Sequence, residues 1–266
     1  MNWDVIVSYL PLYKDGLLIT LYTGWLGILI SIVLGLVTAL IVHFKVPVLK
    51  TIAKIYIEIL RNTPLLIQLF FIYYGIPKLF GIVTDEMTCG IIGLGLLGGA
   101  YMAETFRSGI EAVDTIQMES ALSLGMTRRQ AMFHIILPQA VTYSVPAFVA
   151  NLIFLLKETS VFSCISILEL MFTAKDRIAV SSTTVESLFL VVVFYLIVLL
   201  PVSIIGSVVE RRLRYVITNK LLSPMAVLVG ENVGISLQRR DSTLVIIFFI
   251  NRENIKLRNE SIALNW

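Results

Sequence analysis

The chain has 266 residues, of which 57% are hydrophobic and 15% charged, and its formal net charge is +3. A soluble domain is typically about 45–50% apolar and about 25% charged, so this composition excludes an ordinary water-soluble enzyme and a charge-rich disordered chain. Its two cysteines exclude a disulfide-rich scaffold and give no metal-ligand spacing. The length and the mean hydropathy of +0.88 predict one compact membrane domain.

The N-terminal segment, residues 1–15, is a short amphipathic lead. Its apolar side chains, among them Trp3 and Tyr13, suit a position along the membrane interface, and a loosely held leader is the alternative. The uncharged run Leu17–Val42 follows. It is longer than the apolar region of a signal peptide, about 7–15 residues, and no basic segment precedes it. This run therefore predicts a membrane-spanning helix.

Four further segments complete a predicted bundle of five membrane-spanning helices. Pro138–Leu156 and Ser187–Val209 are uncharged and supply the roughly 20 apolar residues that a helical crossing needs. Asn62–Pro77 and Cys89–Ala103 are shorter, and functional polar groups lie at their inner ends. The predicted fold class is an all-α, polytopic membrane helix bundle. Small residues allow close helix packing in lipid, and the third span is rich in them: Gly90, Gly93, Gly95, Gly98 and Gly99.

The basic residues orient this bundle, because cytoplasmic segments of membrane proteins carry an excess of lysine and arginine. With the N-terminus outside, the inner segments hold Lys45, Lys50, Lys54, Arg107, Arg128, Arg129, Arg211, Arg212, Arg214 and Lys220. The outer segments then hold only Lys14, Lys78, Lys157, Lys175 and Arg177. The bias predicts an outer N-terminus, an inner C-terminus and a cytoplasmic location for residues 110–137.

A polar break interrupts the second span at Arg61–Pro64. Pro64 removes a backbone hydrogen bond, and freed carbonyl groups are tolerated in a membrane only where they face protein or a watery cavity. Thr63 and Gln68 are therefore candidates for a substrate pathway together with Pro64, and a plain proline kink is the alternative. For Arg61 we expect a side chain that extends to the inner membrane surface.

The ends of the third and fourth spans carry the remaining intramembrane polar groups. Glu104 and Arg107 are three residues apart on a predicted helix, so we expect them to pair in a structural role. At the end of the fourth span, Glu158 suits the ammonium of a zwitterionic amino acid and Lys157 its carboxylate. A self-neutralising pair at the outer interface is the alternative. The other candidates for this pathway are Asn151, Thr159 and Ser160.

The segment 111–140 is too polar to cross the membrane. Asp114 or Thr115 can cap a first helix, and Gly125 permits the left-handed turn that closes it. A second helix begins at Arg128, and Pro138 suits the first turn of the next span. This order predicts a cytoplasmic helix–glycine–helix hairpin, of a shape that fits a groove on a soluble partner.

The hairpin resembles the EAA motif of bacterial ABC importer permeases. Glu119–Ala121, three residues, Gly125, nine residues and Ile135–Pro138 reproduce the spacing of that motif, with Ser120 in place of the middle alanine. Other segments resemble the polar amino acid branch of the family, and the resemblance covers roughly residues 1–215. These segments are Leu60–Phe70, Ala100–Ile110, Leu156–Ser160 and Glu210–Arg214.

The resemblance implies the fold of a type I importer permease with five helices and a cytoplasmic coupling hairpin. It also implies a second permease subunit, two ATPase subunits that bind ATP and magnesium, and an extracytoplasmic amino-acid-binding protein. The chain has no GxxxxGK[ST] phosphate loop, so we expect a transport subunit that is not itself an enzyme and holds no cofactor. The residues expected to couple the permease to the ATPase are Glu119, Ala121, Gly125, Arg128, Arg129, His134 and Pro138.

Two of these expectations have alternatives. The first concerns the basic residues of the hairpin, Arg128, Arg129 and His134. They suit pairing with acidic groups on an ATPase, and they suit equally well a solvated face that follows the positive-inside rule. A secondary amino acid transporter or a channel is the alternative to the ATP-driven importer. No catalytic arrangement supports a membrane enzyme, and a scaffold does not need the hairpin spacing. Lipid is an expected partner and nucleic acid is not, and the expected location is a bacterial cytoplasmic membrane.

The predicted domains are the lead 1–15, the permease domain 16–215 and a C-terminal extension 216–266. Residues 227–229, 233–237 and 242–250 are short strand candidates within the extension. We expect an extension of no dedicated function, and a regulatory domain is the alternative. Cys89 and Cys164 are expected to be two unpaired, buried thiols. The sequence does not identify the amino acid, nor whether the two permease subunits are identical.

Overall fold

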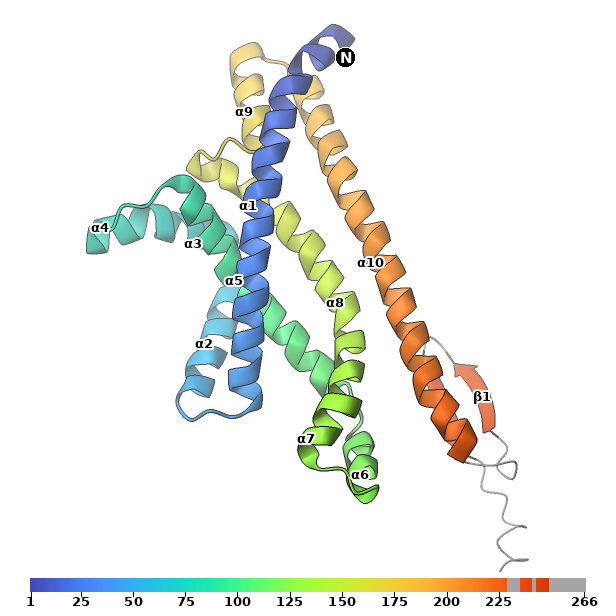
Figure 1. Cartoon of the computed structure of the whole chain (residues 1–266). Helices are drawn as coiled ribbons and strands as arrows, with labels where there is room; N and C mark the ends of the chain where they lie inside the picture. The colour runs from blue at the N-terminus through green and yellow to red at the C-terminus, as the bar shows by residue number, and fades with distance from the viewer. Residues whose placement is uncertain (229–234, 241–242, 249–266) are drawn as a thin grey trace, which may run out of the picture. The chain divides into compact units, whose positions relative to one another are not determined.

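The computed structural model describes the backbone of residues 1–228, 235–240 and 243–248, and the side chains of residues 1–213. The described residues are almost all helical (Figure 1). In chain order the helices are α1 (Trp3–His43), α2 (Leu49–Arg61), α3 (Leu65–Phe70), the π-helix η1 (Phe71–Gly75), α4 (Ile76–Phe80), α5 (Glu86–Glu111), α6 (Thr115–Ser123), α7 (Arg128–Ala131), the π-helix η2 (Met132–Ile136), α8 (Leu137–Glu158), the 3-10 helix η3 (Thr159–Ile165), α9 (Leu170–Ser181) and α10 (Thr184–Leu228). The chain divides into one unit of Met1–Leu213 and another of Arg214–Trp266.

Within the described residues, four helical stretches are long and apolar enough to cross a membrane: Trp3–His43, Glu86–Glu111, Arg128–Ile165 and Thr184–Leu213. A fifth crossing exists if Leu49–Arg61 and Leu65–Phe80, which meet at an angle of 108°, form one broken span. The predicted second span is therefore sharply bent. Pro64 is the cause, because it has no amide hydrogen to continue the helix and its backbone is extended, with ψ 141°.

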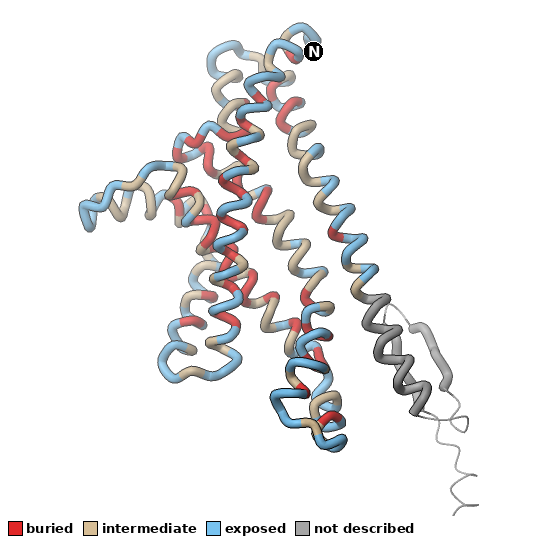
Figure 2. The backbone as a smooth tube through the Cα atoms, in the orientation of Figure 1, coloured by how far each residue is buried: buried red, intermediate tan, exposed pale blue. Residues whose placement is uncertain are grey.

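The centre of the first unit is the packing of α5 against α1 and α8. Figure 2 shows buried residues along these three helices. Glycines permit the close approach: a Cβ atom built on Gly35 of α1 would lie 2.4 Å from Cβ of Met102, and one on Gly98 of α5 would lie 2.1 Å from Oγ of Ser31. The predicted packing role of the glycines in the third span is confirmed.

The N-terminal lead forms the first turns of α1 and packs against the start of α10. The backbone amide of Asn2 donates a hydrogen bond to Oε1 of Glu186 at 2.9 Å. The hydroxyl of the fully buried Tyr13 donates one to the carbonyl of Ser187, also at 2.9 Å. The lead is thus continuous with the first span and tied to protein.

A buried carboxylate begins α9. Glu169 is fully buried and caps this helix, since its side chain accepts hydrogen bonds from the backbone amides of Met171 at 2.8 Å and Phe172 at 2.7 Å. Burial raises the pKa of Glu169 to about 7, although these hydrogen bonds oppose the change.

Two local predictions need correction. Both cysteines are free, as expected, but Cys164 is exposed while Cys89 is buried. In the second unit, β1 (Ile235–Arg240) pairs antiparallel with β2 (Thr243–Phe248), with Ile235 opposite Phe248. The strand candidate at 227–229 is wrong for residues 227 and 228, because α10 continues through Leu228. A helix that has formed extends readily, since each added residue gains a backbone hydrogen bond. Residue 229 lies outside the described residues.

Candidate transport site

The hairpin between α5 and α8 is built from local capping interactions. The side chain of Asp114 accepts a hydrogen bond from the amide of Ile116 at 2.9 Å and so caps α6. Gly125 has φ 83°, which confirms the predicted left-handed turn. Thr127 and Gln130 form a reciprocal capping box that starts α7. These interactions fix the shape of the hairpin independently of distant contacts.

The predicted coupling residues divide by exposure. Ala121 is buried, and so are Val113 and Ile136, which belong to a small apolar cluster at the hairpin. The other predicted coupling residues lie on the surface of the hairpin, free to meet another protein. They are Glu119, Gly125, Arg128, Arg129, His134 and Pro138.

Gln68 forms hydrogen bonds across the break between α2 and α3. Its Nε2 atom donates hydrogen bonds to the carbonyl of Leu60 at 3.0 Å, to the carbonyl of Thr63 at 3.0 Å and to Oγ1 of Thr63 at 2.8 Å. These carbonyls are the groups that Pro64 leaves without a helical partner. Gln68 therefore satisfies the broken backbone, and it is not among the residues that line the adjacent pocket.

A pocket of about 530 Å³, here called the break pocket, lies at this interruption. Its volume is within the range of about 300–1,000 Å³ for small-molecule sites. One wall is the break itself, another is the middle of α5, and a third is the end of α8. It is lined by Arg61, Asn62, Thr63, Pro64, Leu65, Leu66, Leu97, Tyr101, Phe154, Glu158 and Val161.

The break pocket brings together Thr63, Pro64 and Glu158 from the predicted pathway. The side chain of Glu158 is partly buried and forms no hydrogen bond or ion pair within the part of the chain that the structure describes. Leu97, Tyr101 and Phe154 supply apolar and aromatic walls, so the pocket combines apolar surface with a few charged groups.

The other predicted pathway residues lie elsewhere. Asn151 donates a hydrogen bond from Nδ2 to Oγ1 of Thr105 at 2.8 Å, which joins α8 to α5. Thr159 is fully buried and donates to the carbonyl of Leu156 at 2.7 Å. Lys157 is exposed, and neither it nor Ser160 lines the break pocket. Of the two charged groups expected around one ligand, Glu158 lines the break pocket and Lys157 does not.

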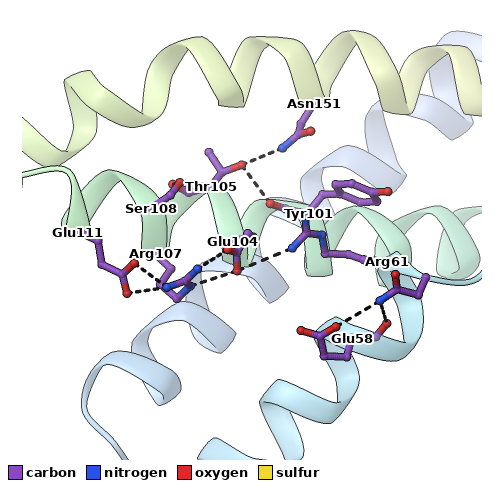
Figure 3. Close-up of polar contacts among 10 residues, drawn as sticks. Glu58, Arg61, Tyr101, Glu104, Thr105, Arg107, Ser108, Glu111 and Asn151 are labelled. Carbon is purple, nitrogen blue, oxygen red and sulfur yellow. Dashed lines mark hydrogen bonds and ion pairs between the residues drawn. The ribbon is translucent and has the colours of Figure 1, made fainter.

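The cation of the break pocket is Arg61. Its Cζ atom lies 5.3 Å from the centroid of the Tyr101 ring, and its Nη1 atom lies 3.9 Å from Oε2 of Glu104 (Figure 3). Arg61 is exposed, and the expected extension of its side chain to the inner membrane surface stays a prediction. Tyr101 and Glu104 share a face of α5 by their spacing, which the sequence shows, but the arrival of α2 on that face is a tertiary contact.

Arg107 pairs with two carboxylates on α5, those of Glu104 and Glu111. Its Nε atom donates to Oε2 of Glu104 at 3.1 Å, and its Nη2 atom pairs with the other oxygen of that carboxylate. Its Nη1 atom donates to both oxygens of Glu111 at 2.6 Å. The predicted pair of Glu104 and Arg107 is confirmed, and Figure 3 shows Glu111 as its third member.

A second pocket of about 640 Å³, here called the basic pocket, lies between the end of α1, α2 and the last turns of α5. Most of its charged side chains are cationic. Its lining residues are Val42, His43, Lys45, Lys50, Lys54, Ile57, Glu58, Arg61, Glu104, Arg107, Ile110 and Glu111.

Comparison with known proteins identifies the class. Residues 15–215 match the family described as binding-protein-dependent transport system inner membrane component. The chain is 38% identical to the probable amino-acid permease protein YxeN of Bacillus subtilis over 79% of this chain and 95% of that protein. It is 32% identical to the arginine transport system permease protein ArtQ of Bacillus subtilis, over 80% of this chain and 98% of that protein.

Solved structures agree with this result. A crystal structure of an amino acid ABC transporter with histidines matches with a TM-score of 0.75 and 36% identity, over 80% of this chain and 99% of that chain. An inward-facing structure of the MetNI methionine ABC transporter matches with a TM-score of 0.66 and 17% identity, over 77% of this chain and 98% of that chain. At that identity the second match shows the fold alone.

The fold and the pockets thus define a multi-pass membrane transport subunit with the fold of a type I ABC importer permease. The chain belongs to the family of binding-protein-dependent transport system inner membrane components. It is the permease subunit of an amino acid ABC transporter, and its relatives are transport subunits of the same kind.

Proposed function

We propose that the chain imports a polar amino acid across the bacterial cytoplasmic membrane and that the break pocket holds this substrate. The observation that carries the proposal is the presence of Arg61 and Glu158 in one pocket at the bent span. A zwitterionic amino acid requires a cationic donor for its carboxylate and an anionic acceptor for its ammonium, and these two side chains supply both.

The arrangement of the pocket supports discrimination as well as binding. Tyr101 holds the guanidinium of Arg61 in position, which reduces the entropy that the arginine loses when it binds a carboxylate. The apolar side chains of the walls lower the local dielectric constant, which strengthens both charge interactions. Thr63 and Asn62 contribute polar groups beside the break. A ligand that lacks either charge leaves a partly buried charge without a partner, which lowers its affinity.

The energy for transport comes, in this proposal, from ATPase subunits that bind ATP and magnesium and dock on the hairpin. The exposed Glu119, Arg128, Arg129 and His134 supply polar contacts for that partner. Gly125 and the buried Ala121 fix the shape of the hairpin. Because α6 follows directly from α5, a movement of the hairpin is transmitted to the helix that carries Tyr101 and Glu104.

The remaining elements of the proposal follow the same scheme. The N-terminus faces the outside and the hairpin the cytoplasm, in agreement with the excess of basic residues on the hairpin side. A second permease subunit completes the pathway, and an extracytoplasmic binding protein delivers the amino acid. The chain itself holds no cofactor.

The proposal is tested on the permease purified with its ATPase, without the binding protein, so that affinity reports on the permease. Equilibrium dialysis with each of the common amino acids should find at least one polar amino acid that binds. Glu158→Gln and Arg61→Gln should each weaken that binding by about 10- to 100-fold, since each removes a charge-assisted hydrogen bond. Lys157→Gln, which changes an exposed charge next to Glu158, is the matched control and should bind as the unchanged protein does.

Two results would contradict the proposal. If Lys157→Gln weakens binding and Glu158→Gln does not, the substrate is held elsewhere. If proteoliposomes take up the same amino acid without the ATPase, the chain is a secondary transporter or a channel.

A further inference from the structure

The break pocket and the basic pocket meet at a single side chain. Among the described residues, Arg61 alone lines both pockets. Tyr101, which holds Arg61 on one side, lines the break pocket, and Glu104, which holds it on the other, lines the basic pocket. Arg61 therefore lies where the two pockets adjoin.

The contact of Arg61 with Glu104 is weak. Arg107 already donates hydrogen bonds to both oxygens of the Glu104 carboxylate. Arg61 reaches the same carboxylate at 3.9 Å and forms no hydrogen bond to it. Partly exposed ion pairs without a hydrogen bond contribute little. A carboxylate that enters the break pocket therefore meets a guanidinium that is held in place yet readily released from its present partner.

The basic pocket has an excess of uncommitted positive charge. Its acidic side chains already have partners: Glu104 and Glu111 pair with Arg107, and Glu58 accepts a hydrogen bond from Asn62 at 3.2 Å. Its lysines have no carboxylate partner among residues 1–213. These lysines are Lys45, Lys50 and Lys54, and the last two are one turn apart on α2.

We propose that the basic pocket is a second binding station for the transported amino acid, in which Lys50 and Lys54 receive the carboxylate that Arg61 releases. The proposal rests on the assignment of the break pocket to the substrate. The guanidinium of Arg61 leaves Glu104 and pairs with the carboxylate of the amino acid. The Arg61 side chain then moves toward Lys50 and Lys54. The last turns of α5, which line the basic pocket, lead into the hairpin, so the second station lies on the hairpin side of the first.

The size and the field of the basic pocket agree with this role. Its volume of about 640 Å³ suits a small ligand. A pocket lined mainly by one sign of charge raises the local concentration of an oppositely charged group. Lysine ammonium groups bind a carboxylate more loosely than a guanidinium fork does, so the second station holds the amino acid weakly enough to release it.

The test uses the complete transporter, with ATPase and binding protein, in proteoliposomes. The probes are radiolabelled L-glutamine, a neutral polar amino acid, and L-arginine, the amino acid that names the similar permease ArtQ. The double variant Lys50→Gln, Lys54→Gln should lower the amount transported per ATP hydrolysed by about fivefold or more, because two weak charge contacts are lost. The Kd measured without binding protein should remain within about twofold, since the break pocket is intact.

Two matched variants separate charge from structure. Lys50→Arg, Lys54→Arg keeps both charges and should restore transport. Lys14→Gln, Lys78→Gln removes two exposed lysines that line neither pocket and should transport normally.

Three results would overturn the proposal. Unchanged transport in the double glutamine variant excludes the second station while leaving the break pocket untouched. Equal loss in the arginine variant assigns the lysines a structural role. If the glutamine variant loses bound phosphatidylglycerol but transports normally, the pocket is a lipid headgroup site. A failure of the assignment of the break pocket is recognised separately, because the Kd of the unchanged complex then fails to respond to Glu158→Gln.

Discussion

The guanidinium of Arg61, the last residue of α2, lies over the ring of Tyr101 in the middle of α5, 5.3 Å from its centroid. The contact fixes where the helix before the break meets the long third span. It also aims a cation into the break pocket beside Glu158, which comes from a third helix. Three segments far apart in the chain thus supply one charged site.

We predict that Tyr101→Leu weakens amino acid binding to the permease–ATPase complex by about 2- to 30-fold, the range that corresponds to the loss of one cation–π contact. Tyr101→Phe keeps the ring and is the matched control, so its affinity should stay close to that of the unchanged protein. Equilibrium dialysis measures both. Equal losses in the two variants would mean that the tyrosine hydroxyl, not the ring, matters.

Gly125 tests the coupling role of the hairpin. We predict that Gly125→Val lowers ATP-dependent uptake at least about tenfold, because a β-branched residue at φ 83° is strained and the turn between α6 and α7 opens. Pull-down of the ATPase with the purified permease should fall in parallel.

Gly81 provides a matched control for this substitution. It has φ 70° and no atom within 4 Å of a built Cβ, as is also true of Gly125, but it lies between α4 and α5. Gly81→Val introduces similar backbone strain away from the hairpin and should retain the ATPase. If both variants lose it equally, the effect is general destabilisation.

The hairpin was predictable from the sequence because its determinants are local. Asp114 stands directly before the first helix that it caps, and Gly125 stands at the left-handed turn, so spacing alone indicates both. The pairing of Glu104 with Arg107 was predictable for the same reason, since both lie on one helical turn. The binding of an ATPase to the hairpin is a separate prediction, because it depends on a second protein.

The charged pocket was only half predictable, because it depends on contacts between distant segments. The sequence indicated Glu158 and the break at Pro64. It assigned the cation to the neighbouring Lys157, which is exposed, whereas the cation that lines the pocket is Arg61. It left open whether Gln68 faces the cavity, and the structure places this side chain against the carbonyls of Leu60 and Thr63 at the bend of 108°. A projection of the sequence onto one straight helix does not include such a bend.

Gly35 tests the packing of α1 against α5. We predict that Gly35→Ala destabilises the purified protein by about 1–3 kcal/mol, which lowers Tm by about 3–10 °C. The reason is that the added Cβ would lie 2.4 Å from Cβ of Met102 and 2.9 Å from the backbone nitrogen of Ala103, neither of which can rotate away.

Gly24→Ala is the matched control on the same helix. Its Cβ would lie 3.2 Å from the ends of the Leu156 and Thr159 side chains, a smaller overlap. Its Tm in detergent should therefore fall less. A Tm for Gly35→Ala equal to or above that of Gly24→Ala would show that α1 and α5 are not packed as described.

Glu169 gives the protein a pH-dependent stability. Burial raises the pKa of its carboxyl from 4.5 to about 7 in the folded state. Between these pH values the folded protein holds a proton that the unfolded chain has released, so stability falls as pH rises through this window and is level above it. A difference of this size corresponds to about 3 kcal/mol.

Glu169→Gln keeps an oxygen to cap α9 but cannot ionise, so we predict that it removes this decline. Melting curves from pH 4 to pH 9 should show a Tm difference between variant and unchanged protein that grows in favour of the variant up to about pH 7 and is then constant. Glu119→Gln, at an exposed position on the hairpin, should follow the unchanged protein throughout. If the Tm of Glu169→Gln falls with pH as steeply as that of the unchanged protein, a different group causes the decline, and Glu169 is ionised in its buried position at the start of α9.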